Sequence, residues 1–371
     1  MINSKYETGT AKVYSKIYHD RYKYHHNQTN YTKKLILKNL KQAKIKRNEF
    51  KNMRVMNIGT GVESVVFNHI GVKKVFHFDL SSRAVNNLKN LSKKRKYKNI
   101  HSTKKNVVRE KIKTSEKINF VFLQGVIHHF SNVENGLKNI IKNIDVKGKI
   151  FIRIYKSGSL GYFYVDFIRK FLDLNSINLF DRIFKKRFKL VTNSSGQVRT
   201  DFLTYLYNHC IDNIFVPSVF LIERKSLQKF FKINGFKNIY KGKSEEYFHN
   251  DLYNKKFSSI SYIFQKEKNF NYKKNRINHV DQLNIKYKEK NIKELVSFLK
   301  DKLNLIRKLN SESKINLAID LFFNVEAFRY QNSFLKKDIR IKGKKLDYPK
   351  NLNDIYKKTI LIINNYINNE H

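Results

Sequence analysis

The chain of 371 residues has one cysteine, two prolines and no tryptophan. Because Cys210 is alone, no disulfide can form within the chain, and we expect the protein to work in a reducing cytoplasm. A zinc site of the usual kind needs several cysteines or histidines at short, regular spacing. The histidines near the N-terminus have no cysteine or carboxylate at such spacing, so no metal is expected.

Long apolar runs are also missing. A helix that crosses a bilayer needs about 20 apolar residues in succession, and the longest runs, such as residues 360–363, are far shorter. The polar N-terminus shows no signal peptide. We therefore expect neither a membrane span nor export.

Carboxylates are scarce: 30 Asp and Glu stand against 76 Lys and Arg, a formal charge of +46. Such a charge suits a nucleic-acid partner. However, Lys far outnumbers Arg, Asn, Ile and Tyr are abundant, and Ala, Gly and Pro are rare, which is typical of AT-rich codons. A nucleic-acid groove would cluster its cations and interleave aromatic side chains, whereas these lysines are spread along the chain. Nucleic acid is therefore a possible partner but not the favoured one.

Residues 53–81 read as a strand, a glycine turn, a helix and a second strand that ends in an acid. The apolar run at residues 55–58 has strand length, and Gly59 and Gly61 follow it. Free N–H groups at such a turn favour an anionic group, and an acid about 20 residues later, here Asp79, can accept hydrogen bonds from ribose hydroxyls. These residues predict a site for a nucleoside cofactor.

The glycine turn alone fits two cofactor classes in part. A dinucleotide fingerprint has Gly or Ala where Ser64 stands, and an S-adenosylmethionine fingerprint usually has a third glycine where Glu63 stands. An oxidoreductase that uses NAD therefore stays as a third-ranked function.

Later segments favour one class. Residues 119–130, NFVFLQGVIHHF, resemble the fourth-strand motif of class I S-adenosylmethionine-dependent methyltransferases, and residues 147–155, KGKIFIRIY, resemble the loop and fifth strand that follow it. Residues 257–265 resemble the closing antiparallel strand of that family. The resemblance covers roughly residues 6–266. It implies an α/β fold, a seven-stranded Rossmann-like methyltransferase sheet with helices on both faces.

The resemblance implies S-adenosyl-L-methionine as the cofactor. Asn57 and Asn106 stand where the family usually has acids, and an amide adds no negative charge opposite the cofactor's ammonium group. Asn57 can also be a turn residue that caps the glycine loop. The expected cofactor-binding residues are Asn57, Gly59, Gly61, Asp79, Asn106 and Gln124.

His128 and His129 follow the fourth strand, where the donor methyl faces in the resembling family. Either can be a general base or a structural histidine that orders the loop, and the sequence does not choose between them. We expect the acceptor site between residues 124–130 and the inserted segment 157–217. Its expected substrate-binding residues are Arg153, Tyr155 and Tyr162.

The predicted function is methyl transfer to an O or N atom of a small molecule or glycoconjugate. Cytosine C5 methylation needs a nucleophilic cysteine by the fourth strand, and Cys210 is far from it. Residues 124–128 also lack the acidic or Asn residue, two prolines and aromatic of amino-directed nucleic-acid enzymes. The alternatives are an RNA-directed methyltransferase and a cofactor-binding protein of the same fold without turnover.

Three parts are expected along the chain. Residues 1–50 form a helical N-terminal cap, and residues 51–268 form the methyltransferase domain with a substrate-binding insertion at residues 157–220. After a linker, three amphipathic patterns predict a small all-α domain at residues 270–371. We expect it to serve packing, homo-oligomerisation or partner recognition.

Overall fold

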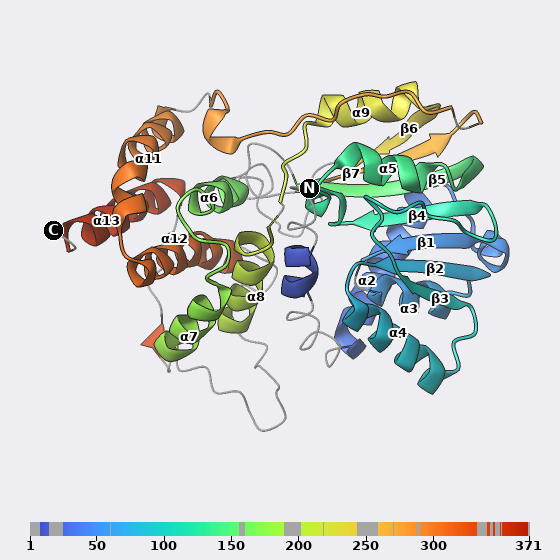
Figure 1. Cartoon of the computed structure of the whole chain (residues 1–371), viewed down its shortest axis with the longest axis horizontal. Helices are drawn as coiled ribbons and strands as arrows, with labels where there is room; N and C mark the ends of the chain where they lie inside the picture. The colour runs from blue at the N-terminus through green and yellow to red at the C-terminus, as the bar shows by residue number, and fades with distance from the viewer. Residues whose placement is uncertain are drawn as a thin grey trace. The chain divides into compact units, whose positions relative to one another are not determined.

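The computed structural model describes residues 8–14, 25–59, 61–155, 160–188, 202–217, 219–242, 259–269, 271–287, 290–331, 340–341, 344–345, 349 and 351–369. The chain divides into two compact units (Figure 1). The first comprises Met1–Tyr155, Pro217–Lys243 and Ser259–His279, and the second comprises Lys156–Val216, Ser244–Ser258 and Val280–His371.

The first unit is built on a seven-stranded sheet with the order β3-β2-β1-β4-β5-β7-β6. Neighbouring strands from β3 to β5 are parallel, while β7 is antiparallel to both β5 and β6. This antiparallel strand is the one expected of a methyltransferase-type sheet, so the predicted fold is confirmed. The strands are β1 Arg54–Ile58, β2 Lys74–Asp79, β3 Ile100–Lys104, β4 Ile118–Gln124, β5 Ile144–Tyr155, β6 Phe236–Lys241 and β7 Ser259–Lys266.

The central strands are buried on both faces because their side chains alternate between two apolar clusters. Phe120 and Phe122 of β4 belong to one cluster, and Val121 and Leu123 belong to the other. Helices α2 (His25–Gln42) and α3 (Val62–His69) contribute to the first cluster, and α5 (Val133–Ile141) and α9 (Arg224–Ile233) contribute to the second. Helix α4 (Ser82–Arg95) contacts β2 and β3. The continuous apolar run of β4 thus forms the covered parallel strand that its sequence predicts.

The second unit is helical over almost all of its described residues. Helix α12 is apolar on most of its sides, as expected of a helix that is surrounded by others, and it contacts α6, α7, α8 and α13. Tyr164 and Thr359 share a buried hydrogen bond of 2.6 Å. The elements are α6 Leu160–Ile168, α7 Ile177–Phe188, α8 Phe202–Ile214, η4 Gln282–Asn284, α11 Lys290–Lys308, α12 Ser311–Gln331, β8 Arg340–Ile341, β9 Lys344–Lys345 and α13 Leu352–Asn368.

This division differs from the expected domain boundaries in two places. Residues 156–216, expected as an insertion of the sheet domain, belong to the same compact unit as the C-terminal helices. Residues 271–279, expected in the helical domain, pack on the sheet unit, where Ile277 is buried in a core cluster. Helical periodicity gives the apolar face of each helix, but it does not give the partner that covers that face.

Two further expectations concern membranes and metals. No helix within the described ranges is long and apolar enough to cross a bilayer. Among the same residues, no group of three His, Cys, Asp or Glu side chains is arranged to hold a metal ion.

Candidate active site

The glycine turn joins β1 to α3 at the carboxyl end of the sheet. Gly59 has φ +120° and Gly61, the N-cap of α3, has φ +79°, conformations that residues with a side chain rarely adopt. A Cβ atom at Gly59 would also lie 3.3 Å from Cγ2 of Val126. Both glycines are therefore required by the backbone, and neither places a side chain between the turn and a ligand. Thr60 lies outside the described residues.

Asp79 ends β2 beside this turn. The N–H of Gly59 donates to the carbonyl of Phe78 at 3.2 Å, and Asp79 is the next residue. Asp79 is 7% exposed, and its carboxylate accepts a hydrogen bond from the N–H of Ser81 at 2.6 Å. Burial raises the pKa of Asp79 to about 7, against the effect of the backbone N–H groups of Ser81 and Leu80. The acid and the turn predicted from sequence are thus neighbours.

His77 was not predicted as a site residue, yet it holds the glycine turn. Its ring is fully buried, with Nε2 2.7 Å from the carbonyl of Gly59 and Nδ1 2.7 Å from the hydroxyl of Ser102. Because a carbonyl only accepts, Nε2 carries the proton and Nδ1 accepts from Ser102. Burial lowers the pKa of His77 to about 4, so the ring is neutral. The available sequence signal was a polar residue within an apolar strand, two positions before the acid.

The two amides at the usual acid positions have partners within the protein. The side-chain oxygen of Asn57 accepts from the hydroxyl of Ser64 at 2.8 Å, which ties β1 to α3. The side-chain oxygen of Asn106 accepts from the N–H groups of Val108 at 3.1 Å and Arg109 at 3.3 Å. Asn106 therefore caps the turn that follows β3. Both side chains stabilise loops at the carboxyl edge of the sheet.

The end of β4 and the loop after it contain buried polar atoms that lack partners. Within the described residues, Oε1 of Gln124 and both ring nitrogens of His128 accept or donate no hydrogen bond. The ring of His128 is fully buried and stacks on Tyr155 at 3.8 Å between centroids. Burial and, after it, the charges of His129 and Arg153 lower the pKa of His128 well below its usual value. Unsatisfied buried polar atoms are costly, so a group of them marks a place suited to a polar ligand.

His129 lies next to a side chain from the N-terminus. The hydroxyl of Tyr14 is 2.7 Å from Nε2 of His129, and the two rings meet edge to face. Tyr14 is the last of the helical residues 8–14. This segment is packed against the protein, because Val13 is buried and a Cβ on Gly9 would lie 2.6 Å from Pro217. The N-terminal segment therefore packs over the β4 loop. Tyr14 was not predicted, because 115 residues separate it from its partner.

Two of the three predicted substrate-binding residues lie on β5 beside this loop. Arg153 pairs in register with Gln124, and its Nε donates to the hydroxyl of Ser259 at 2.6 Å. Tyr155 ends β5 and covers His128. The third residue, Tyr162, lies on α6 in the second unit. The first unit thus brings together Gln124, His128, His129, Arg153 and Tyr155.

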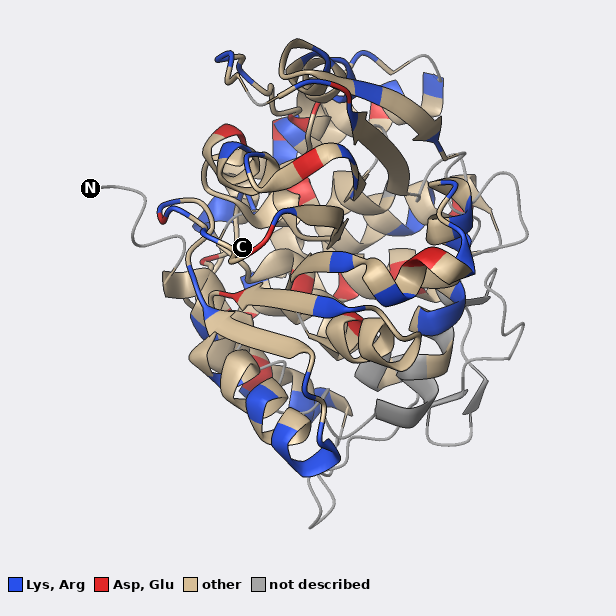
Figure 2. Cartoon of the chain, turned by 90° about the vertical axis from the view of Figure 1, so that its right-hand side faces the viewer, with Lys and Arg blue, Asp and Glu red and all other residues tan. Residues whose placement is uncertain are grey.

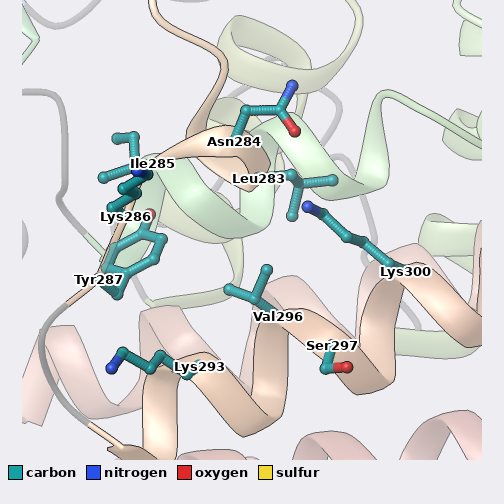
Figure 3. A pocket seen from close by; sticks show the side chains of 9 residues that line it. All are labelled: Leu283, Asn284, Ile285, Lys286, Tyr287, Lys293, Val296, Ser297 and Lys300. Carbon is teal, nitrogen blue, oxygen red and sulfur yellow. The ribbon is translucent and has the colours of Figure 1, made fainter.

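The second unit has a groove of its own, with a volume of about 550 Å³ (Figure 3). It lies between helix α11 on one side and η4 with the segment after it on the other, and Lys300 points toward Leu283 whereas Lys293 points away from it. None of the lining residues was predicted as a site residue. They are Leu283, Asn284, Ile285, Lys286, Tyr287, Lys293, Val296, Ser297 and Lys300.

Comparison with known proteins gives matches among solved structures. No family model and no curated protein matches the chain. Magnesium protoporphyrin IX methyltransferase from Synechocystis PCC 6803, with bound SAH, is 11% identical over 65% of this chain and 82% of its own, with a TM-score of 0.37. PKMT2 from Rickettsia typhi is 14% identical over 59% of this chain and 51% of its own, with a TM-score of 0.41. MccD is 10% identical over 64% of this chain and 96% of its own, with a TM-score of 0.38. Because these identities and TM-scores are low, we assign the fold from the strand order of the sheet and not from these matches.

Proposed function

We propose that the chain is an S-adenosylmethionine-dependent methyltransferase. The observation that carries the proposal is the strand order of the sheet, together with the left-handed glycine turn and the buried Asp79 at its carboxyl edge. In open α/β sheets, ligands bind outside the carboxyl ends of the strands, where the strand order reverses. Here the order reverses between β1 and β4.

The residues at this edge fit the cofactor. The backbone of Gly59 and Gly61 would face it, and the carboxylate of Asp79 would accept hydrogen bonds from the two ribose hydroxyls. The unpartnered Oε1 of Gln124 would accept an N–H. When bound, the cofactor supplies a methyl group on an activated leaving group, so the protein mainly has to orient two reactants in a dry site.

We assign the role of general base to His129 rather than His128. The ring of His128 is buried, neutral and stacked on Tyr155, which suits a residue that orders the loop. His129 is only partly buried and has the hydroxyl of Tyr14 at Nε2. If Nε2–H donates to Tyr14, Nδ1 is the basic nitrogen that takes the proton from an acceptor hydroxyl or amine.

The acceptor we propose is a small molecule or glycoconjugate with an O or N atom to be methylated. Gln124, Arg153 and His129 offer a charge and several hydrogen-bonding groups, and Tyr155 offers an aromatic wall. A few convergent polar groups against an apolar surface suit a medium-sized ligand with a sugar or polyol end. We propose that the acceptor is methylated in the cytoplasm.

A second candidate is a cofactor-binding protein of the same fold without turnover. It is favoured by Asn57, which adds no negative charge at the usual acid position and whose oxygen is engaged by Ser64. Methyl transfer from labelled cofactor to any fraction of the cell's own extract would exclude this candidate. Label in a glycan or small-molecule fraction supports the proposed acceptor, and label in RNA contradicts it.

Cofactor binding is tested separately by calorimetry with S-adenosylmethionine and its demethylated product. Replacing Asp79 with Ala should weaken binding by about 1.5 to 3 kcal/mol, the value of a hydrogen bond to a charged group. Asp301→Ala, which removes an exposed carboxylate from the second unit, is the matched control and should bind normally. Equal affinities of wild type and Asp79→Ala would contradict the assignment.

A further inference from the structure

A basic surface lies at the amino ends of the first three strands, and we call it the amino-end surface. It consists of Lys33 on α2, His69 at the end of α3, Lys73 before β2, Arg95 at the end of α4 and Tyr97 two residues after it. Nε2 of His69 is 2.8 Å from the hydroxyl of Tyr97, and the two rings meet edge to face. The end of α3 and the segment after α4 thus meet at one aromatic pair.

Two of these cations lie near enough to His69 to act on its charge. Burial and, after it, the charges of Lys33 and Arg95 lower the pKa of His69. Since Lys33 belongs to α2 and Arg95 to α4, the aromatic pair has a positive charge from each neighbouring helix. The side chains of Lys33, His69 and Arg95 are exposed, so these groups are accessible to a partner.

Few local carboxylates neutralise this surface. Residues 21–48, which include α2, and residues 80–109, which include α4, contain no Asp or Glu. Glu116, near the same ends of the strands, already lies within 4 Å of three cations: Lys74 at 3.0 Å, Arg54 at 3.4 Å and Lys73 at 3.9 Å. Figure 2 shows how far Lys and Arg exceed Asp and Glu over the described part of the chain. Lys33 and Arg95 therefore lie on helices that carry no carboxylate of their own, whereas Lys73 contacts Glu116.

The amino-end surface is distinct from the candidate active site. Lys73 precedes β2 and Asp79 ends it, so the two regions lie at opposite ends of the same parallel strands. A ligand on this surface does not occupy the glycine turn.

We propose that the amino-end surface binds the phosphate backbone of a single-stranded nucleic acid. Cations release the counterions of a phosphate backbone, and an aromatic ring such as the exposed imidazole of His69 can stack on a base without regard to sequence. A membrane surface is the less suitable partner, because helices that lie on lipid insert large apolar side chains. The exposed large apolar residues of the described chain are Val146, Ile360 and Leu361, and none lies on this surface. This inference does not depend on methyl transfer.

The test must distinguish RNA binding by this surface from RNA binding that depends only on the net charge of the whole chain. Lys33→Glu/Arg95→Glu reverses two charges on the amino-end surface. Lys225→Glu/Lys229→Glu makes the same change in net charge on exposed positions of α9, which packs against the opposite face of the sheet from α2 and α3. A difference between the two variants therefore reports on position rather than on total charge.

The binding of a fluorescein-labelled single-stranded RNA of about 20 nucleotides to the full chain is measured by anisotropy at several salt concentrations. The first variant should bind at least about tenfold more weakly, and its slope of log K against log salt should fall by about 1.4, or 0.7 for each phosphate that no longer meets a cation. The α9 variant should stay within about twofold of wild type. If both variants lose the same affinity, binding is diffuse and the proposal is wrong.

Two controls keep the result interpretable. The far-UV circular dichroism spectrum and the melting temperature of each variant must match those of wild type. If those of Lys33→Glu/Arg95→Glu do not match, Lys33→Gln/Arg95→Gln is used in its place, and a smaller loss of RNA affinity is expected. Vesicles that contain phosphatidylserine provide the competing partner. Vesicle binding that the first variant loses, while its RNA binding stays at the wild-type value, would overturn the proposal in favour of a lipid surface.

Discussion

The imidazole of His77 hydrogen-bonds the carbonyl of Gly59 at 2.7 Å. This contact fixes the first residue of the glycine turn to the second strand, while Ser102 holds the other ring nitrogen from the third strand. The conformation of the turn therefore depends on a side chain 18 residues away as well as on its own glycines.

Replacing His77 with Leu should destabilise the first unit. The carbonyl of Gly59 and the hydroxyl of Ser102 would lose their partner, and each buried group left unsatisfied costs about 1 to 3 kcal/mol. Urea denaturation followed by tyrosine fluorescence measures the loss. Ser102→Ala is the milder control, since it keeps the bond to Gly59. A Leu variant as stable as wild type would show that His77 does not hold the turn.

The same residue predicts a pH dependence. The pKa of His77 is about 4 in the folded chain, against an ordinary value of 6.5, so between these values only the unfolded chain binds the proton. Stability contributed by this residue therefore rises with pH from about 4 to 6.5, by about 3 kcal/mol in total. Denaturation at pH 4.5 and pH 7 should show this rise in wild type relative to His77→Leu.

Asp79 predicts an opposite effect in the same range. Its pKa is about 7 in the folded chain, against an ordinary value of 3.8, so between these values only the folded chain binds the proton. Stability contributed by Asp79 therefore falls as the pH rises from about 4 to 7, and Asp79→Asn removes this fall. If the proposed cofactor binds the ionised carboxylate, its affinity should drop about tenfold for each pH unit below 7. Calorimetry at pH 5.5, 6.5 and 8 checks this, and an unchanged affinity at pH 5.5 would exclude ionised Asp79 as the ligand.

Local features of this site were predictable from the sequence. The glycines need positive φ, the apolar run of β4 needs cover on both faces, and Asp79 ends a strand that follows a helix with a glycine stop. Each of these features depends on residues that are neighbours in sequence or on a short repeat of apolar residues. The contacts of His77 with Gly59 and of Tyr14 with His129 depend on strand register and on packing between distant segments. No periodicity encodes them, so the sequence left the two histidines after β4 equivalent, and their different burial separates them only in the structure.

His128 and His129 should respond differently to substitution. His129→Ala should lower the rate of label transfer to the acceptor fraction by about 100-fold while cofactor affinity stays intact, because a general base contributes about this much. Tyr14→Phe, which removes only the hydroxyl at Nε2, should give a smaller loss and shift the pH profile. His128→Phe keeps the stack on Tyr155 and should retain most of the rate. Loss of cofactor binding in His129→Ala would indicate a structural role instead.

The end of the sheet unit can be tested by truncation. Residues 271–279 pack on that unit: Ile277 is buried in its core and donates its N–H to Glu134 at 2.5 Å, and the backbone of Lys273 exchanges two hydrogen bonds with the side chain of Asn234. A chain that ends at His279 should therefore unfold at a higher urea concentration than one that ends at Lys268, since burying a side chain such as Ile277 contributes about 1.5 to 3 kcal/mol. Both chains lose α12, which packs against α6, α7 and α8, so both need the same solubility tag for a fair comparison.

Full-length Ile277→Ala provides a check that does not depend on truncation, with an expected loss of about 2 to 5 kcal/mol in the free energy of unfolding. Equal stability of the two truncated chains, together with a neutral Ile277→Ala, would move the boundary back to the linker that the sequence predicts.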